Sequence, residues 1–413
     1  MRVWLITVGE PLPLPGRTPR LLRTGLLADE LVQRGHQVTW WTSHVDHYAK
    51  QYFPGNARPV VLDNGVELRF LRGVLYRRNV SLARLVNHRQ LARDFRVQRE
   101  TVRAPDVILC SLPTIELARA ASAWGSSHGI PVLIDVRDLW PDVLAEAVAT
   151  PLRPLARIAL MPLYREARAA LRDCTGIIGI SRGYLDWALR LAGRTESRHD
   201  GVVPLGYPRL RVSPTAVAAA RERLKAGGVR FERRLVWFVG SFGRTYDLFP
   251  LLEAGRMLAD AGPEDVQIVI SGDGEDSEAY RRAAAGLENV VFTGWLEPAA
   301  LAVMLQSAAI GVAAYRAGAP QGLPNKLFEY LSGGIPVISS LQGEARDLIG
   351  QLDCGMSYDP REPRALARAI REMLSDEPGR RRKAANARRA FEERYSSERV
   401  CAALVARIES ARA

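Results

Sequence analysis

The chain has 413 residues, more than an ordinary single core holds, and its length predicts two domains of roughly 200 residues each. Apolar residues make up 47% and charged residues 25% of the sequence, which is typical of a globular protein and excludes a disordered or fibrous one. The net charge of +12 favours anionic partners, either phosphorylated small molecules or an anionic membrane surface. Nucleic acid is disfavoured, because no basic stretch carries interleaved stacking aromatics.

The termini and cysteines predict a cytoplasmic protein. No apolar run approaches the ~18 residues that span a bilayer. The apolar stretch within Met1–Glu10 predicts a buried first strand, since it is too short for a signal peptide and no cleavage site follows it. None of the histidines forms a metal-binding pattern, so no metal or other cofactor is expected. Four cysteines without paired spacing are expected to be reduced thiols in the core: Cys110, Cys174, Cys354 and Cys401.

Along the first half of the chain, strand-like apolar runs alternate with helical patterns, which predicts a parallel α/β architecture. The first helix is expected to begin near Thr18, with Pro19 at its first position and Gly35 after its end. The predicted strands lie at 3–8, 37–42, 66–71, 106–110, 131–136 and 176–180, with a last strand and turn over 202–206.

The second half repeats this plan, and its continuous apolar runs suit strands buried on both faces. No strand pattern appears over 207–234, so the boundary is placed there, giving domains 1–205 and 206–385 and a C-terminal helix 386–413. That helix is the end of one long helix predicted over 378–412. The predicted strands lie at 235–240, 266–271, 289–293, 310–314 and 335–340.

Two loops of the first domain hold candidate site residues. The strand within Leu133–Asp142 should end near Val136, which places Arg137 and Asp138 at the carboxyl edge of the sheet, where open α/β sheets bind ligands. They either contact a ligand or form a loop held by local hydrogen bonds, with Trp140 as packing. The other candidate, Gly16, lies in the proline-rich loop between the first strand and the first helix.

A basic stripe is predicted on a helix over 84–103, opposite an apolar face with Leu91 and Phe95. It is either a solvated face or a surface for anionic lipid headgroups or a diphosphate-linked acceptor. A weaker candidate for membrane contact is the apolar, proline-interrupted segment 152–163. The stripe consists of Arg89, Arg93, Arg96, Arg99 and Arg103.

The most informative stretch is 321–334, which predicts a short helix after Gly322–Leu323, with Pro324 at its first position and Gly333 at its end. Lys326 lies in the first turn, where a positive charge opposes the helix macrodipole. Lys is also rare in this chain, which holds four Lys against fifty-three Arg. A Lys beside free first-turn N–H groups favours a phosphate or diphosphate site. The alternative is a surface ion pair with Glu329.

A second candidate for phosphate binding is Arg244, in a Gly-bearing loop between a strand and a helix. The alternative is a plain turn with an exposed Arg. Arg244 and Lys326 each follow a strand of the same predicted sheet, so they are expected at the same edge.

Residues 324–338, Pro-Asn-Lys-Leu-Phe-Glu-Tyr-Leu-Ser-Gly-Gly-Ile-Pro-Val-Ile, resemble the nucleotide-sugar motif of glycosyltransferase family 4. The resemblance implies the GT-B fold, two Rossmann-like domains with parallel sheets facing across a cleft, with the last helix crossing back to the first domain. Members place two Glu eight positions apart, and the second binds the donor ribose. Glu329 matches the second Glu, whereas Gln321 stands at the first and supplies no carboxylate.

The resemblance implies a retaining glycosyltransferase that moves a sugar from a nucleoside-diphosphate sugar, UDP-sugar favoured, to an acceptor hydroxyl. The acceptor is expected to be a lipid-linked glycan in bacterial surface-polysaccharide synthesis, at the inner face of the cell membrane. Arg244 and Lys326 would hold the diphosphate, so no metal is expected, and Gly322, Leu323 and Asn325 would lie beside it. Gly16 would approach the diphosphate or acceptor. Arg137 and Asp138 are the candidate catalytic residues, in contact with sugar or acceptor.

Two other functions stay open. A non-catalytic nucleotide-binding subunit of a polysaccharide assembly complex would explain Gln321. A sugar-nucleotide 2-epimerase is less favoured, because that chemistry needs acid–base groups that are sparse here. The products separate the three hypotheses: a new glycoside, an epimerised nucleotide sugar, or neither.

Overall fold

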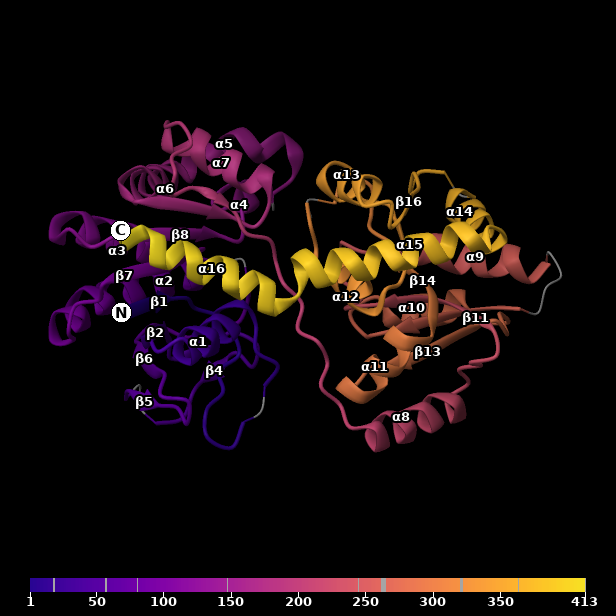
Figure 1. Ribbon diagram of the computed structural model, residues 1–413. Helices are drawn as coiled ribbons and strands as arrows, with labels where there is room; N and C mark the ends of the chain where they lie inside the picture. The colour runs from indigo at the N-terminus through magenta and orange to yellow at the C-terminus, as the bar shows by residue number, and fades with distance from the viewer. Residues whose placement is uncertain are drawn as a thin grey trace. The chain divides into compact units, whose positions relative to one another are not determined.

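The computed structural model describes residues 1–17, 19–55, 58–79, 81–146, 148–243, 245–260, 265–319, 322–362 and 364–412. The chain divides into an N-terminal unit, Met1–Leu205 with Val400–Ala413, and a C-terminal unit, Gly206–Arg399 (Figure 1). Each unit is an α/β domain built on its own sheet, which confirms the predicted fold class.

The N-terminal unit is built on a sheet of strand order β10-β9-β8-β7-β1-β2-β6-β5, parallel except for the edge strand β5. Alternate residues of β1 face opposite cores: Trp4 packs under α2, α3, α6 and α7, whereas Leu5 packs under α1 and α16. The elements are β1 (Arg2–Ile6), α1 (Arg23–Gln33), β2 (Gln37–Ser43), β3 (Val45–Asp46), β4 (Gln51–Tyr52), β5 (Val60–Val61), β6 (Glu67–Leu71), α2 (Leu82–Gln98), β7 (Val107–Leu112), α3 (Ile115–His128), β8 (Val132–Val136), α4 (Asp142–Glu146), α5 (Arg153–Ala159), α6 (Met161–Asp173), β9 (Gly176–Gly179), α7 (Arg182–Ala192) and β10 (Gly201–Val202).

The C-terminal unit is built on an all-parallel sheet of strand order β13-β12-β11-β14-β15-β16. The order reverses between β11 and β14, so the loops after these two strands form the crevice in which such sheets bind ligands. The elements are α8 (Pro214–Ala226), β11 (Arg234–Val239), α9 (Phe249–Asp260), β12 (Val266–Ser271), α10 (Ser277–Ala283), β13 (Val290–Gly294), α11 (Pro298–Ser307), β14 (Ala308–Ala313), α12 (Asn325–Gly333), β15 (Val337–Ser339), α13 (Glu344–Gln351), β16 (Gly355–Ser357), α14 (Ala365–Ser375) and α15 (Glu377–Ala390). The last helix, α16 (Ser397–Arg412), belongs to the N-terminal unit from Val400 on.

Every strand predicted from the sequence is present, with its ends shifted by a few residues at most. The predicted start of the first helix is wrong: α1 begins at Arg23, and Thr18 lies outside the described residues. The short strands β3, β4, β5 and β16 carry too few residues for a periodic signal and were not predicted.

The single helix predicted over 378–412 is also wrong. A π-helical turn at Phe391–Tyr395 follows α15, and Ser396 is extended, with φ −66° and ψ 146°. The Tyr207 N–H donates to the Tyr395 carbonyl at 3.0 Å, and the Ser397 N–H donates to the Tyr207 carbonyl at 3.0 Å. This backbone pairing, which helix propensity does not encode, separates α15 from α16.

The four cysteines are buried and form no disulfide bond with one another, as predicted. Within the described part of the chain, no helix combines the length and the apolar character that a membrane crossing needs.

Candidate functional site

Helix α12 is fixed on the sheet of the C-terminal unit by Tyr330. The buried Tyr330 hydroxyl lies 2.9 Å from the Val312 carbonyl and 3.1 Å from the Trp237 carbonyl, and it accepts from the Val239 N–H at 3.3 Å. Leu327, Phe328 and Leu331 are buried on the same helix. These contacts bind α12 to both β11 and β14, so its N-terminus is held at the point where the strand order reverses.

The first turn of α12 has no side-chain cap. The helix begins at Asn325, one residue later than predicted, so Pro324 is its N-cap and not its first residue. A proline side chain offers no acceptor for the first N–H groups. At the other end, Gly333 is the last helical residue and the left-handed position, φ +66°, belongs to Gly334 rather than to Gly333. The uncapped N-terminus therefore offers backbone donors to an anion.

Lys326 in this first turn is buried, with only 5% of its surface exposed. Its Nζ has no hydrogen-bond partner among the described residues. The ammonium lies 3.7 Å from the centre of the Phe238 ring and 4.7 Å from that of Tyr246. The rings provide a cation–π environment, which stabilises the charge less than a hydrogen-bonded counter-ion does.

Burial lowers the pKa of Lys326 from 10.5 to about 7, and the charge of Glu329 opposes this shift. A bound anion would favour the charged form and raise the pKa again. The alternative prediction, a surface ion pair between Lys326 and Glu329, is wrong, because Lys326 is buried and no salt bridge between the two occurs in the described chain.

Glu329 instead accepts a hydrogen bond from the Tyr207 hydroxyl, with 2.6 Å between the oxygens. The Tyr207 side chain is buried and its backbone pairs with residues 395–397, so the hydroxyl is held in place. Glu329 itself is half-buried. Tyr207 therefore orients a carboxylate that still reaches solvent.

The loop after β11 lies against Lys326 because Gly240 has no side chain. Gly240 has φ +152°, and a Cβ added there would lie 2.5 Å from the Lys326 Nζ. Its neighbour across the sheet, Gly272, has φ +131°, and a Cβ there would lie 1.9 Å from the Gly240 carbonyl oxygen. Both positions need glycine, for conformation and for close backbone packing.

The structure describes some of the other predicted site residues of this unit and leaves two outside the described ranges. Gly322 and Leu323 are half-buried in the loop that enters α12, and Asn325 is exposed in its first turn. Arg244 and Gln321 lie outside the described residues. Lys326 and Glu329 thus lie on one helix, and Gly322 and Leu323, expected beside the diphosphate, lie in the loop that enters it.

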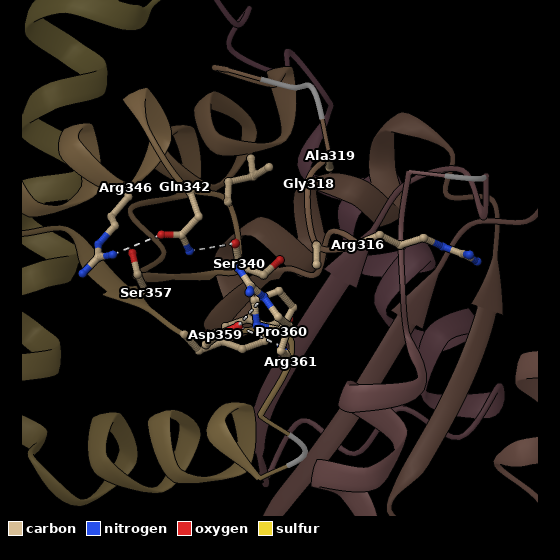
Figure 2. A pocket seen from close by; sticks show the side chains of 13 residues that line it. Arg316, Gly318, Ala319, Ser340, Gln342, Arg346, Ser357, Asp359, Pro360 and Arg361 are labelled. Carbon is tan, nitrogen blue, oxygen red and sulfur yellow. Dashed lines mark hydrogen bonds and ion pairs between the residues drawn. The ribbon is translucent and has the colours of Figure 1, made fainter. Parts of the chain in front are cut away.

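A separate pocket of about 330 Å³ lies after β14, β15 and β16 (Figure 2). None of the predicted site residues that the structure describes lines it. The Arg316 Nε donates to the Tyr246 carbonyl at 2.9 Å, and an Arg346 Nη donates to the Gln342 Oε1 at 3.0 Å. The Arg316 and Arg346 side chains of this pocket thus already have hydrogen-bond acceptors, whereas the Lys326 Nζ has none among the described residues.

In the N-terminal unit, the carboxyl end of β8 carries a buried charge network centred on Asp135. Arg23 donates to both oxygens of Asp135, at 2.9 and 3.1 Å, and the Arg137 Nε donates to one of them at 2.7 Å. Burial alone would raise the pKa of Asp135, but the two guanidiniums hold it below its usual value.

Arg137, a predicted catalytic residue, donates from each of its three guanidinium nitrogens within this network. Besides the bond to Asp135, its guanidinium donates to the Glu10 carboxylate and, at 3.0 Å, to the Thr24 hydroxyl. The Glu10 carboxylate in turn accepts from the Thr24 N–H at 3.0 Å. Arg137 thus ties the loop after β8 to the loop after β1 and to the start of α1.

Asp138, the other predicted catalytic residue, accepts a hydrogen bond from the Leu139 N–H at 2.9 Å. Burial raises the pKa of Asp138, and Arg84 partly offsets the shift. Trp140 is buried in the core beneath it. Local hydrogen bonds and Trp140 packing hold this loop, and its contact with a sugar or acceptor stays a prediction.

Gly16 lies apart from this network, exposed in a turn closed by a 2.9 Å bond from the Arg17 N–H to the Leu14 carbonyl. Its φ is +77°, and an added Cβ would meet no atom within 4 Å. The backbone conformation alone explains the glycine, and its approach to a substrate stays a prediction.

Sequence reasoning missed Tyr207, Glu10 and Arg23. Tyr207 lies 122 residues from its partner Glu329, and no local pattern connects them. A signal did exist for the network in the N-terminal unit, because Asp135 is the one charged residue inside the otherwise apolar strand β8. A fully buried carboxylate requires cationic partners.

Residues 233–376 match the family model described as Glycosyl transferases group 1, and this range contains Lys326 and Glu329. The chain has no match among curated proteins.

Solved structures match over nearly the whole chain. Sucrose-phosphate synthase from Thermosynechococcus elongatus is 19% identical, with TM-score 0.72 over 99% of this chain and 98% of that one. HepE from Anabaena, in complex with UDP, is 16% identical, with TM-score 0.67 over 99% of each chain. WaaG, a glycosyltransferase involved in lipopolysaccharide biosynthesis, is 15% identical, with TM-score 0.64 over 97% of this chain and 98% of that one. At these identities the likeness establishes the fold alone.

The fold and the matched domain define the class of GT-B glycosyltransferases. Within that class, the C-terminal unit carries a domain of the glycosyl transferases group 1 type.

Proposed function

We propose that this protein transfers a sugar, with retention of configuration, from a UDP-sugar to a hydroxyl of a lipid-linked glycan in bacterial polysaccharide synthesis. The reaction takes place at the cytoplasmic face of the membrane and uses no metal. The observation that carries the proposal is Lys326, a buried ammonium without a hydrogen-bond partner among the described residues, at an uncapped helix N-terminus.

The donor diphosphate fits this position by charge. Its oxygens accept hydrogen bonds from the ammonium and from the first N–H groups of α12. When the glycosidic bond breaks, negative charge grows on the leaving diphosphate, so a fixed cation there stabilises the transition state more than the ground state. Arg244 adds a second cation in this proposal, and Gly322, Leu323 and Asn325 lie along the diphosphate.

The donor ribose binds Glu329 in this proposal. A carboxylate accepts hydrogen bonds from two neighbouring hydroxyls, and the Tyr207 hydroxyl holds Glu329 in a fixed orientation. Gln321, which stands where the family motif has its first Glu, would contribute amide hydrogen bonds to the sugar rather than a charge.

The N-terminal unit contributes the acceptor end. Asp138, whose pKa is raised by burial, contacts the acceptor hydroxyl or the sugar. In this proposal the part of the Arg137 guanidinium that is still exposed contacts the sugar. The bonds of Arg137 within the network hold the Asp138 loop in position. Gly16 lies on the acceptor path.

The choice of UDP and of polysaccharide synthesis rests on similar structures. HepE is complexed with UDP and with UDP-glucose, and WaaG is described as acting in lipopolysaccharide biosynthesis. A lipid-linked acceptor also agrees with the net charge of +12, which favours an anionic membrane surface.

The test is calorimetric titration with UDP, GDP, ADP and dTDP, followed by incubation of the protein with UDP-sugars and a bacterial lipid extract. We expect binding of UDP and a new glycolipid whose anomeric configuration, read by NMR, matches the donor. An epimerised UDP-sugar without glycolipid would establish the epimerase. UDP binding with neither product would establish the non-catalytic subunit.

A further inference from the structure

Helix α5 buries none of its residues. Helices of globular proteins normally place an apolar stripe in the core. In α5, however, Leu155 is 64% exposed and Ile158 is 67% exposed. Five large apolar side chains of this segment are exposed, although Leu160 packs partly against the core, and these five are here named the α5 surface: Val148, Leu152, Leu155, Ile158 and Met161.

This concentration of exposed apolar groups differs from scattered surface residues. The α5 surface collects five large apolar side chains within fourteen consecutive residues. Helix α2 also exposes apolar residues, but Leu91 and Phe95 anchor α2 in the core. A contiguous apolar patch on an otherwise unburied helix marks a surface that a partner covers.

The charges around the α5 surface indicate an anionic partner. Residues 148–165 contain Arg153, Arg157 and Arg165 and no acidic residue. A groove of about 700 Å³ beside α5 is lined by Arg157, Arg165, Arg168 and Arg190. No salt bridge in the described part of the chain joins any of these four to a carboxylate.

The one carboxylate in the groove is already engaged. Asp142 accepts from the Trp187 indole N–H at 2.6 Å and from the Tyr164 hydroxyl. The four guanidiniums outnumber this carboxylate, so the groove carries net positive charge next to exposed apolar side chains. A phospholipid headgroup carries the phosphate that suits such a groove, and the acyl chains suit the apolar side chains.

We propose that the α5 surface docks this protein on an anionic lipid bilayer, with Leu155 and Ile158 inserted at the level of the headgroups. The groove receives lipid phosphate, and the arginines of α2 take no essential part. Only helix α4 separates the segment from the Arg137–Asp138 loop along the chain, so docking keeps that loop near the membrane. The inference deepens the proposed function, since only a lipid-linked acceptor gives the bilayer a role in the reaction.

The test is flotation of the full chain with phosphatidylcholine vesicles that contain or lack phosphatidylglycerol. We expect binding only to the anionic vesicles, weakened by salt, because screening reduces the attraction between arginine and lipid. Leu155→Glu with Ile158→Glu should lower the bound fraction about tenfold or more, because two charges would then have to enter the headgroup region. Both side chains are exposed, so unfolding temperature and UDP affinity should stay as in the wild type.

Two control variants make the result specific. Val61→Glu replaces an equally exposed valine, 70% exposed, on the edge strand β5 and should leave vesicle binding intact. Val86→Glu with Val97→Glu places the same charges on α2. The proposal is overturned if the α2 pair abolishes binding while the α5 pair does not, or if neutral vesicles bind as well.

Other occupants give distinct outcomes. A wild-type dimer in sedimentation velocity that the α5 pair converts to monomer would assign the surface to a second copy and refute membrane docking. Vesicle binding without UDP binding would refute the donor site and leave the docking surface standing, whereas UDP binding without vesicle binding would do the reverse.

Discussion

The Lys326 ammonium lies 3.7 Å from the centre of the Phe238 ring, and no acceptor among the described residues forms a hydrogen bond to it. A buried charge of this kind is unfavourable by itself. Lys326 lies at an uncapped helix N-terminus, where an anionic ligand would supply the missing partner.

Lys326→Met should weaken UDP binding by an order of magnitude or more, because a hydrogen bond to a charged group contributes about 1.5–3 kcal/mol. The same variant should unfold at higher urea concentration without nucleotide, since a buried charge is removed at nearly constant volume. Lys225→Met, at an exposed lysine of α8, is the matched control and should change neither property. Calorimetry and urea unfolding measure the two effects. Unchanged UDP affinity in Lys326→Met would refute the donor site.

Stability should depend on pH through Lys326. Its folded pKa of about 7 lies below the 10.5 of an exposed lysine, so between these values the unfolded chain binds more protons. The free energy of unfolding should therefore rise with pH across that window, by an amount on the order of a few kcal/mol, relative to Lys326→Met. Parallel pH curves for the two proteins would contradict the assignment.

UDP binding should take up a proton. At pH 8–9 (roughly one to two units above the folded pKa) Lys326 is mostly neutral, and a bound diphosphate restores its charge. Titrations in buffers of different ionisation enthalpy should give different apparent heats, and this difference should vanish in Lys326→Met. The absence of any buffer dependence in the wild type would show that Lys326 does not meet the diphosphate.

Gly240→Ala should disturb the same site from the other side. The new Cβ would lie 2.5 Å from the Lys326 Nζ in a backbone conformation that favours glycine. The ammonium can move away, so the fold should survive while UDP affinity falls several-fold. Gly243→Ala is the control in the same loop, because a Cβ there meets no atom within 4 Å. Equal effects of the two substitutions would show that any change in this loop weakens UDP binding, and that the contact of residue 240 with Lys326 is not the cause.

Glu329→Ala should abolish discrimination between UDP and 2′-deoxy-UDP. If the carboxylate binds the ribose hydroxyls, wild-type protein loses affinity for the deoxy ligand, whereas the variant binds both equally weakly. Tyr207→Phe, which removes the 2.6 Å hydrogen bond to Glu329, should reduce discrimination only in part. Calorimetric titrations of the two ligands complete the cycle. Discrimination that persists in Glu329→Ala would place the ribose elsewhere.

Asp135→Asn should destabilise the N-terminal unit by about 3–5 kcal/mol, because Arg23 and Arg137 would keep buried charges without a counter-ion. Since the pKa of Asp135 is lowered by folding, its contribution is present above pH 3.8, its ordinary pKa, and is lost at lower pH. Glu196→Gln breaks the exposed pair with Arg182 and should leave the urea midpoint nearly unchanged. Similar urea midpoints for the two variants would show that the network is not a structural element.

The sequence by itself determined the two α/β units and the position of each predicted strand. Continuous apolar runs such as Val236–Val239 can only be buried on both faces of a parallel sheet, and this signal is local. The sequence also indicated Lys326, because a Lys in the first turn of a helix conflicts with the macrodipole wherever the helix lies. Glu329 was indicated by the resemblance to the family motif.

Only the tertiary structure decided what surrounds those residues. The burial of Lys326 against Phe238, the bond from Tyr207 to Glu329 and the five-residue network around Asp135 all join segments far apart in the chain. The break between α15 and α16 has the same origin, since a backbone pair with Tyr207 overrides strong helix propensity. Periodicity and propensity describe neighbours along the chain, whereas burial, pKa and partners depend on which distant segments meet.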